Sequence, residues 1–153
     1  GGIILSMMDK VAYACASKHA GTYCVTVSVD HVEFRQPVEV GELVSLLASV
    51  NYVRRTSHVV GIRVEALDVT TGFVKHTNSS YFTMVAKGAD NKPTPVPKLI
   101  LQNEEDIKRF IESMRMREIK NKVSEQMDDK RSTVDVQKAL SLLKNERCII
   151  QRK

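Results

Sequence analysis

Apolar residues surround most of a helix that opens at Gly1 and Gly2. At about 100° per residue, one broad apolar face carries Ile4, Met7, Met8, Val11 and Cys15. The other side carries Asp9 among small or apolar neighbours, namely Gly2, Leu5, Ala12, Tyr13 and Ala16. A helix that is apolar on nearly every side is usually buried. An acid on such a helix is paired, protonated or functional, unless it simply benefits from the helix N-terminus or faces a water-lined groove.

After this helix the apolar residues alternate with a period of two, which predicts β-strands. The first predicted strand spans residues 23–34, and one face of its first half carries Val25, Val27 and Val29. The apolar phase then slips, so that Val32 and Phe34 carry the pattern onward. A phase slip inside one strand indicates a β-bulge, which we place at about Asp30-His31.

Three further strands are predicted by the same alternation of apolar residues. The second covers residues 43–52, with one face made of Val44, Leu46, Ala48, Val50 and Tyr52. The third covers residues 58–68, with Val60, Ile62, Val64 and Ala66 in phase. A turn at Thr71-Gly72 leads to a fourth strand over residues 73–86, whose middle is unusually polar. The proline-containing stretch 88–97 fits neither a helix nor a central strand and is predicted to be a linker.

One long buried helix followed by four strands favours an α+β fold in which an antiparallel sheet wraps around a central helix. An all-β sandwich would leave the helix unexplained. A parallel α/β fold would need helices between the strands, and the connections at 53–57 and 70–73 are too short for them.

Residues 99–153 form a separate C-terminal extension of about two helices. Asn103 is a suitable N-cap, and the i, i+3, i+4 spacing of Ile107, Phe110, Ile111, Met114, Glu118 and Ile119 predicts an amphipathic helix. A polar break at residues 128–131 precedes a second helix capped by Ser132 or Thr133. The apolar stripes could pack on the core or on a neighbouring subunit, bind a regulatory partner, or bind a membrane surface.

Composition narrows the class of protein. The 153 residues suit one domain with an appendage, and no stretch reaches the roughly 20 apolar residues of a membrane span. The formal charge of +5 divides into +2 over residues 1–101 and +3 over residues 102–153, without a patch dense enough to indicate nucleic-acid binding. Three cysteines without metal-binding spacing favour a reducing, cytoplasmic compartment and no zinc site.

Two blocks of sequence carry a resemblance to a known family. The first is Gly1-Gly2 followed by an apolar stretch that ends in Met8-Asp9, and the second is the block from Val25 to Glu42, with Phe34, Pro37, Val38, Val40 and Gly41 at family positions. In their order and separation they resemble the hotdog-fold acyl-CoA thioesterases, a group that contains bacterial short-chain and animal cytosolic acyl-CoA hydrolases. The resemblance covers residues 1–98, which it identifies as a hotdog domain.

The resemblance implies an acyl-CoA thioesterase that hydrolyses fatty acyl-CoA. Asp9 falls on the family's catalytic carboxylate, as general base or as nucleophile, and the helix N-terminus at Gly1 and Gly2 would polarise the thioester carbonyl. The family's N-terminal strand, with an assisting Asn, is expected upstream of this sequence and is missing from it. Family sites lie at a homodimer interface, and related thioesterases are trimers of dimers.

Coenzyme A would enter only as part of substrate and product, with no other cofactor and no metal. The turn made of Arg54, Arg55, Thr56 and Ser57 is the candidate contact for its phosphates or pantetheine, with Lys75 as a weaker candidate. Two alternatives stay open: a non-catalytic acyl-CoA-binding or regulatory module, and an enoyl-thioester hydratase or dehydratase. The absence of a His-containing F-P-G-H-F-P block counts against the latter.

Overall fold

The structure, a computed structural model, describes residues 1–151, with every side chain in that range except that of Ser132. Its elements, in chain order, are α1 (Gly2–Ala20), β1 (Cys24–Phe34), β2 (Leu43–Val53), β3 (Ser57–Leu67), β4 (Val74–Ala86), α2 (Glu104–Ser132), α3 (Val136–Ala139) and the 3-10 turn η1 (Leu140–Leu143). The chain divides into two compact units, Gly1–Met114 and Arg115–Lys153.

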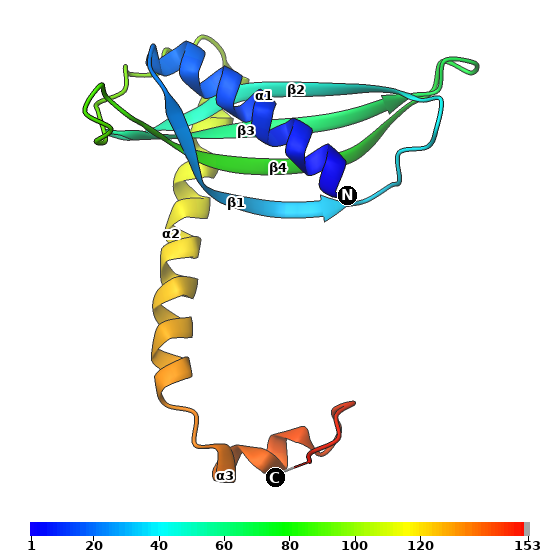
Figure 1. The fold of residues 1–153 in the computed structure, drawn as a ribbon, viewed down its shortest axis with the longest axis vertical. Helices are drawn as coiled ribbons and strands as arrows, with labels where there is room; N and C mark the ends of the chain where they lie inside the picture. Colours follow the sequence, from blue (N-terminus) through cyan, green and yellow to red (C-terminus); the bar gives the residue numbers. More distant parts are fainter. Residues whose placement is uncertain (152–153) are drawn as a thin grey trace. The chain divides into compact units, whose positions relative to one another are not determined.

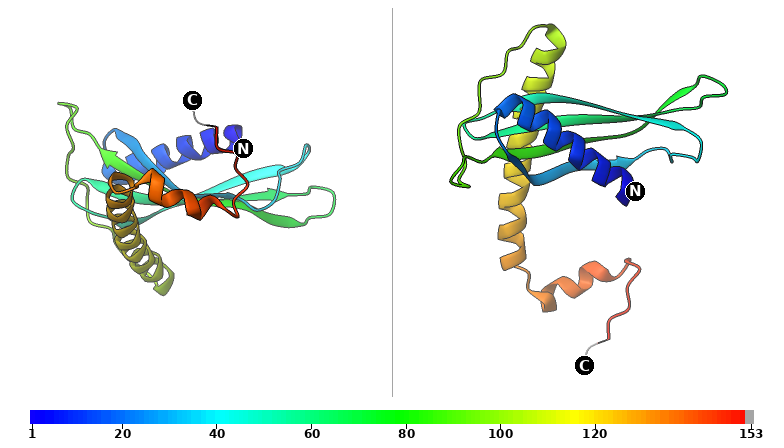
Figure 2. Two further views of the ribbon diagram at one scale, coloured as in Figure 1. Left: turned by 90° about the horizontal axis from the view of Figure 1, so that it is seen from below. Right: turned by 45° about the horizontal axis from the view of Figure 1, so that its top comes forward.

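The four strands form one antiparallel sheet in the order β1-β4-β3-β2, and α1 lies across one face of it (Figure 1). This is the helix-and-sheet arrangement expected for the hotdog fold. The second view in Figure 2 shows the same crossing of α1 over the sheet. α1 ends where Gly21 adopts a left-handed conformation and its N–H bonds the Ser17 carbonyl, so a glycine suits this C-cap.

The helix buries a narrower stripe than its sequence pattern predicts. Met8, Ala12 and Ala16 are fully buried against the sheet, where they meet Val60, Val64, Phe82 and Met84. Ala12 and Ala16 come from the side of the helix that carries Asp9, so the broad apolar face predicted from the sequence is not the one that packs most closely on the sheet. Small alanines let the helix approach the sheet closely, so the contact centres on them rather than on Met7, which stays exposed.

Strand β1 contains the expected bulge and a second one. Its register against β4 shifts between Asp30 and Glu33, where His31 has a positive φ of 57°, so the bulge expected at Asp30-His31 is confirmed. Another shift lies between Thr26 and Ser28. Because of this extra bulge, Val25 pairs with Val85 on the outer face, whereas Val29 pairs with the buried Phe82. The prediction of one shared face for Val25, Val27 and Val29 is therefore wrong.

A similar irregularity moves Tyr52 in β2. The register between β2 and β3 shifts at Asn51, and Tyr52 lies opposite Val59 rather than on the face that carries Val50. Its ring meets Phe110 of α2 edge-on, with centroids 4.9 Å apart. The expectation that Tyr52 continues the core-facing set of this strand is wrong because Asn51 takes the extra position. The core set of β3 (Val60, Ile62, Val64 and Ala66) is confirmed, as all four side chains are buried.

The C-terminal helices differ in length from the expectation. The Asn103 side chain accepts a hydrogen bond from the N–H of Asp106, which confirms it as the cap of α2. The expected break at residues 128–131 is absent, since α2 continues to Ser132. Exposed charged residues are tolerated in a helix, and Lys130 and Arg131 favour its negative C-terminal end. The cap of α3 is Asp135, rather than Ser132 or Thr133.

Candidate active site

Asp9 and Thr26 meet where α1 passes over the edge strand β1. The Thr26 hydroxyl donates a hydrogen bond of 2.6 Å to Oδ1 of Asp9. The two residues line a surface hollow of about 340 Å³, together with Lys10, Tyr13, Tyr23, Cys24 and Val25. A carboxylate held by one oxygen keeps the other available for a water molecule or for a substrate carbon.

Thr26 is a site residue that the sequence analysis missed. The predicted alternation of Val25 and Val27 in this strand gives Thr26 no role in a site. In the structure Thr26, just before the bulge, pairs with the buried Met84 of β4. Its side chain therefore lies on the face of the sheet that α1 covers. The signal in the sequence is a β-branched residue with a hydroxyl group, in the strand that follows a helix carrying a single acid.

Cys24 also lines the hollow, but its chemistry excludes it as a nucleophile. Its side chain is buried, and burial is the main cause that raises the pKa of its thiol. The thiolate, not the thiol, is the nucleophile. A buried thiol with a raised pKa stays protonated near neutral pH, so Cys24 is a poor nucleophile.

The N-terminus of α1 offers backbone donors. Gly1 is the N-cap and receives no side-chain capping bond, while its carbonyl accepts the N–H of Leu5 at 3.0 Å. The N–H groups of the first turn have no partner inside the helix. A β-carbon on Gly1 would approach the Phe34 ring to 3.3 Å, whereas one on Gly2 would meet open space. Glycine at position 1 therefore serves the packing of Phe34.

The helix separates these donors from Asp9. Gly2 and Asp9 are seven residues apart, which corresponds to about 10 Å along an α-helix. A single carbonyl carbon attacked beside Asp9 could not have its oxygen at the N-terminus of the same helix. Within one chain, the structure does not bring Gly1 and Gly2 together with Asp9.

The turn of Arg54, Arg55, Thr56 and Ser57 joins β2 to β3. Its backbone is held by three hydrogen bonds: Arg54 N–H to Ser57 C=O, Ala86 N–H to Thr56 C=O and Val96 N–H to Arg55 C=O. Both arginine side chains are exposed, and the two hydroxyl residues are half-buried. The next residue, His58, lies in the same row across the sheet as Met84 and Thr26. Since strands are about 4.8 Å apart, the turn lies at the Asp9 end of the sheet.

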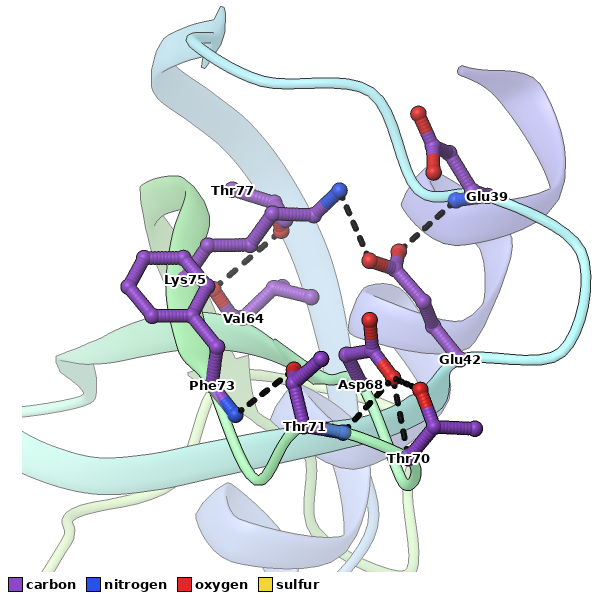
Figure 3. A network of polar contacts seen from close by, with 9 residues as sticks. All are labelled: Glu39, Glu42, Val64, Asp68, Thr70, Thr71, Phe73, Lys75 and Thr77. Atoms are coloured by element: carbon purple, nitrogen blue, oxygen red, sulfur yellow. Dashed lines mark hydrogen bonds and ion pairs between the residues drawn. The ribbon is translucent and has the colours of Figure 1, made fainter.

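Lys75 lies at the other end of the sheet. About ten residues of β4 separate it from Val85, roughly 33 Å of extended chain. Its Nζ is 2.8 Å from Oε1 of Glu42, and each side chain is only 12% exposed (Figure 3). Glu42 also accepts the Glu39 N–H at 2.8 Å, and this bond, followed by that of Lys75, lowers the pKa of its carboxyl. Lys75 thus anchors the loop before β2 and is not brought together with the Arg54 turn in one chain.

His58 is the most buried of the four histidines. It is 1% exposed, its Nε2 lies 3.2 Å from the Ala16 carbonyl, and its Nδ1 has no hydrogen-bond partner. Its ring lies 5.9 Å from that of His19, whose Nε2 is 2.9 Å from the Pro97 carbonyl. These contacts join α1 to β3 and to the linker, which is a structural role.

In residues 1–151 no group of three His, Cys, Asp or Glu side chains is arranged to hold a metal ion. None of the helices described there is long and apolar enough to cross a membrane.

The amino-acid sequence is similar to those of known proteins. A family model described as the thioesterase superfamily matches residues 1–73. Protein VdlD of Helicobacter pylori is 44% identical over 122 residues, which cover 80% of this chain and 70% of that protein. The cytosolic acyl coenzyme A thioester hydrolase of Rattus norvegicus is 32% identical over 114 residues, 73% of this chain but only 30% of that protein.

Solved structures give the same picture. An acyl-CoA hydrolase from Bacillus cereus superimposes with a TM-score of 0.77 at 34% identity, covering 87% of this chain and 80% of the other. A hexameric acyl-CoA thioesterase gives 0.78 at 35% identity, covering 81% and 80%.

A third set of structures comes from the acyl-CoA hydrolase of Staphylococcus aureus. A complex of its variant with alanine in place of one asparagine, bound to coenzyme A, gives a TM-score of 0.75 at 26% identity, covering 88% of this chain and 82% of the other. Further structures carry alanine in place of one threonine (TM-score 0.68, 27% identity, covering 83% and 84%) or one aspartate (0.73, 25%, covering 86% and 80%).

Proposed function

Because this chain belongs to the acyl-CoA thioester hydrolases of the thioesterase superfamily, we propose that it hydrolyses fatty acyl-CoA to a free fatty acid and CoA, with Asp9 as the reactive carboxylate. The observation that carries the proposal is the hydrogen bond from Thr26 to Asp9 in the hollow beside β1. The aspartate and the threonine replaced in the Staphylococcus aureus hydrolase are 17 residues apart, and so are Asp9 and Thr26.

The chemistry can follow either of two routes. As general base, Asp9 takes a proton from water while the resulting hydroxide adds to the thioester carbonyl; the C–S bond then breaks and the CoA thiolate takes a proton. As nucleophile, Asp9 displaces CoA to form a mixed anhydride, which water hydrolyses to the fatty acid and the free carboxylate. In both routes Thr26 is a positioning residue that orients the carboxylate.

The oxyanion formed in either route needs donors that Asp9's own helix does not place nearby. The separation of about 10 Å between Gly2 and Asp9 in one helix favours a site composed of two subunits. In such a site the first turn of one α1 would face Asp9 of the other, and its free N–H groups would stabilise the developing charge.

The apolar surface beside the hollow supports this dimer. Side chains exposed on α1 and on β1 include Ile3, Met7, Tyr13, Val27, Val29, Val32 and Phe34. β1 is also an edge strand with unpaired backbone groups. We assign this surface to a homodimer, and we extend the assembly to a trimer of dimers because hexameric thioesterases are among the similar structures. A stable monomer in sedimentation at micromolar concentration would contradict the assignment.

Coenzyme A is the only cofactor-like group that this proposal requires. We assign its phosphates to Arg54 and Arg55 and its pantetheine to Thr56 and Ser57, because these side chains project from the end of the sheet that holds Asp9. Lys75 lies at the other end of the sheet from the Arg54 turn, so it could contribute to the same CoA site only from another subunit. We place the activity in the cytoplasm, in keeping with the cytosolic rat hydrolase.

The decisive experiment replaces the carboxylate alone. Asp9→Asn keeps the size and the hydrogen bond with Thr26 but removes both the base and the nucleophile. Release of free thiol from a panel of acyl-CoA substrates should fall on the order of a hundredfold or more, while acyl-CoA binding persists. The assay compares the variant with the parent chain and with Asp90→Asn, an exposed acid of the linker that does not line the hollow. Hydrolysis at the parent rate would falsify the assignment of Asp9; binding by the parent chain without turnover would favour a non-catalytic module.

A further inference from the structure

The positive charge of this protein resides in its second compact unit. Residues 1–114 contain 12 Lys and Arg against 12 Asp and Glu, a net charge of zero. Residues 115–153 contain 11 Lys and Arg against 6 Asp and Glu, a net charge of +5. The division between the compact units falls between Met114 and Arg115, so the charge that looks dispersed along the sequence belongs to one unit.

The part of α2 within this unit carries an exposed apolar stripe. Four side chains form it: Met116, Ile119, Val123 and Met127. At about 100° per residue they fall within a sector of about 80° of the helix circumference. The last three are exposed by 55%, 53% and 63%, respectively, so in this chain they remain largely uncovered.

Charged residues are sorted around this stripe by sign. The acids of the same stretch all lie on the far side, more than about 120° from the middle of the stripe; they are Glu118, Glu125, Asp128 and Asp129. Except for Arg117, which lies about 120° from the middle of the stripe, the bases lie closer to it than the acids do. Arg115 and Lys122 lie on one flank, Lys120 and Arg131 on the other, and Lys130 within the stripe's own sector. Long basic side chains next to an apolar stripe can extend their charged ends to a polar boundary while their stems stay in apolar surroundings.

This arrangement discriminates between possible partners. A second copy of the same helix face would bring basic flank against basic flank, and like charges repel. A planar anionic surface would attract both flanks at once, accept the apolar stripe, and leave the acids pointing away from it. Amphipathic helices with basic residues on the polar face bind the interface of anionic bilayers in this way.

Further apolar side chains of the same unit are exposed. Val134, Leu142 and Ile149 are 61%, 77% and 91% exposed. α3 and η1 surround a hollow of about 290 Å³ with apolar walls, formed by Val134, Val136, Ala139, Leu140, Leu142 and Leu143. We propose that the unit from Arg115 onward is an interfacial module that docks this protein on an anionic lipid surface through the Met116–Met127 stripe and its basic flanks.

The test is flotation of the whole chain with lipid vesicles. Vesicles of phosphatidylcholine with about 30% phosphatidylglycerol should carry the protein upward, whereas pure phosphatidylcholine vesicles should not. Binding should weaken in high salt, because surface charges are screened over a shorter distance. Equal binding to both kinds of vesicle, or none to the anionic ones, overturns the proposal.

Matched variants locate the surface. Arg115→Glu with Arg131→Glu reverses one charge on each flank and should weaken binding to anionic vesicles by at least about tenfold. Ile119→Ser with Val123→Ser should weaken binding through loss of the apolar stripe. The control, Glu118→Gln with Glu125→Gln, changes the far side and should leave binding equal or stronger. Thermal melting checks that each variant is folded, and this readout does not depend on thioester hydrolysis.

Two outcomes would contradict the assignment even if the parent chain floats. Vesicle binding that is equally reduced in the far-side control would mean that the stripe is not the contact. A change in oligomer size in sedimentation, with unchanged flotation of the Ile119 and Val123 variant, would assign the stripe to a second copy instead.

Discussion

The hydroxyl of Thr26 holds Oδ1 of Asp9 from a neighbouring strand, 2.6 Å away and 17 residues along the chain. The bond connects α1 to β1 at the wall of the hollow. A threonine hydroxyl has one proton, and here it points to the carboxylate of Asp9. The 3.3 Å contact between the same hydroxyl and Sδ of Met84 is therefore a packing contact.

Removal of this hydroxyl should therefore impair catalysis more than stability. Thr26→Val preserves the β-branched shape and leaves Asp9 without its support. We expect kcat to fall by about 10- to 100-fold, since a misplaced catalytic group costs this much, with little change in KM for acyl-CoA. Thr26→Ser keeps the hydroxyl and should retain most of the activity. Equal rates for the valine and serine variants would assign Thr26 to packing alone.

The Arg54–Ser57 turn can be tested separately from the chemistry. Arg54→Ala combined with Arg55→Ala removes two exposed charges and leaves the backbone hydrogen bonds of the turn in place. Loss of a charge-assisted contact costs about 1.5–3 kcal/mol, so KM should rise roughly tenfold or more while kcat is maintained. The matched control is Arg63→Ala, which removes an exposed arginine from β3, outside the turn. An unchanged KM in the double variant would leave this turn as a solvated hairpin.

The sequence predicts this fold well where strands are regular and less well where they are interrupted. Val60, Ile62, Val64 and Ala66 alternate without a break, and each lies in the core as expected. Strands β1 and β2 have extra residues at Val27 and Asn51, which reverse the faces of the residues beyond them. Alternation alone does not reveal a bulge whose flanking residues are all compatible with a strand.

The candidate site was predictable to the same extent. Asp9 stands out on an apolar helix, but Thr26 becomes its partner only through the bulge and the crossing of α1 over β1. Lys75 and Arg54 look alike as basic residues in sequence, yet the register of β4 places them at opposite ends of the sheet. Their separation depends on strand pairing, which no local pattern encodes.

His58 should make the stability of the protein sensitive to acid. Burial is the main cause that lowers its pKa, the neighbouring His19 acts in the same direction, and the hydrogen bond with Ala16 opposes them. The other titratable group in contact is the Cys24 thiol, with Sγ 3.9 Å from Nε2. Above the ordinary histidine pKa of about 6.5 both the folded and the unfolded states are neutral at this residue. As the pH falls below that value, the unfolded state binds the proton first and the free energy of unfolding decreases.

The measurement is the melting temperature between pH 8 and pH 5 for three chains. The parent should lose stability below about pH 6.5. His58→Gln retains an N–H donor for Ala16 but cannot be protonated, so its melting temperature should vary less over this range. His76→Gln, at a half-buried histidine on β4, is the control and should follow the parent. Parallel curves for the parent and for His58→Gln would exclude His58 as the source of the acid sensitivity.

The last prediction concerns whether one chain or two chains build the oxyanion site. Gly2 is the first residue of α1, a position where proline is tolerated because its missing N–H would have no partner in the helix. Open space surrounds the position where a side chain would attach. Gly2→Pro should therefore leave the melting temperature nearly unchanged and lower kcat by about a hundredfold, the usual effect of losing one oxyanion donor.

Mixing the two inactive variants then separates the geometries. In a dimer that pairs Gly2→Pro with Asp9→Asn, one of the two composite sites combines an intact first turn with an intact Asp9. Random reassortment makes half of the dimers mixed, so about a quarter of the parent activity should return in a symmetric dimer. If each site were built within one chain, every site in the mixture would carry a defect and no activity would return. Mixing Asp9→Asn with Thr26→Val is the control: both residues line the same hollow, so each composite site has one defective wall or the other, and reassortment should restore much less activity.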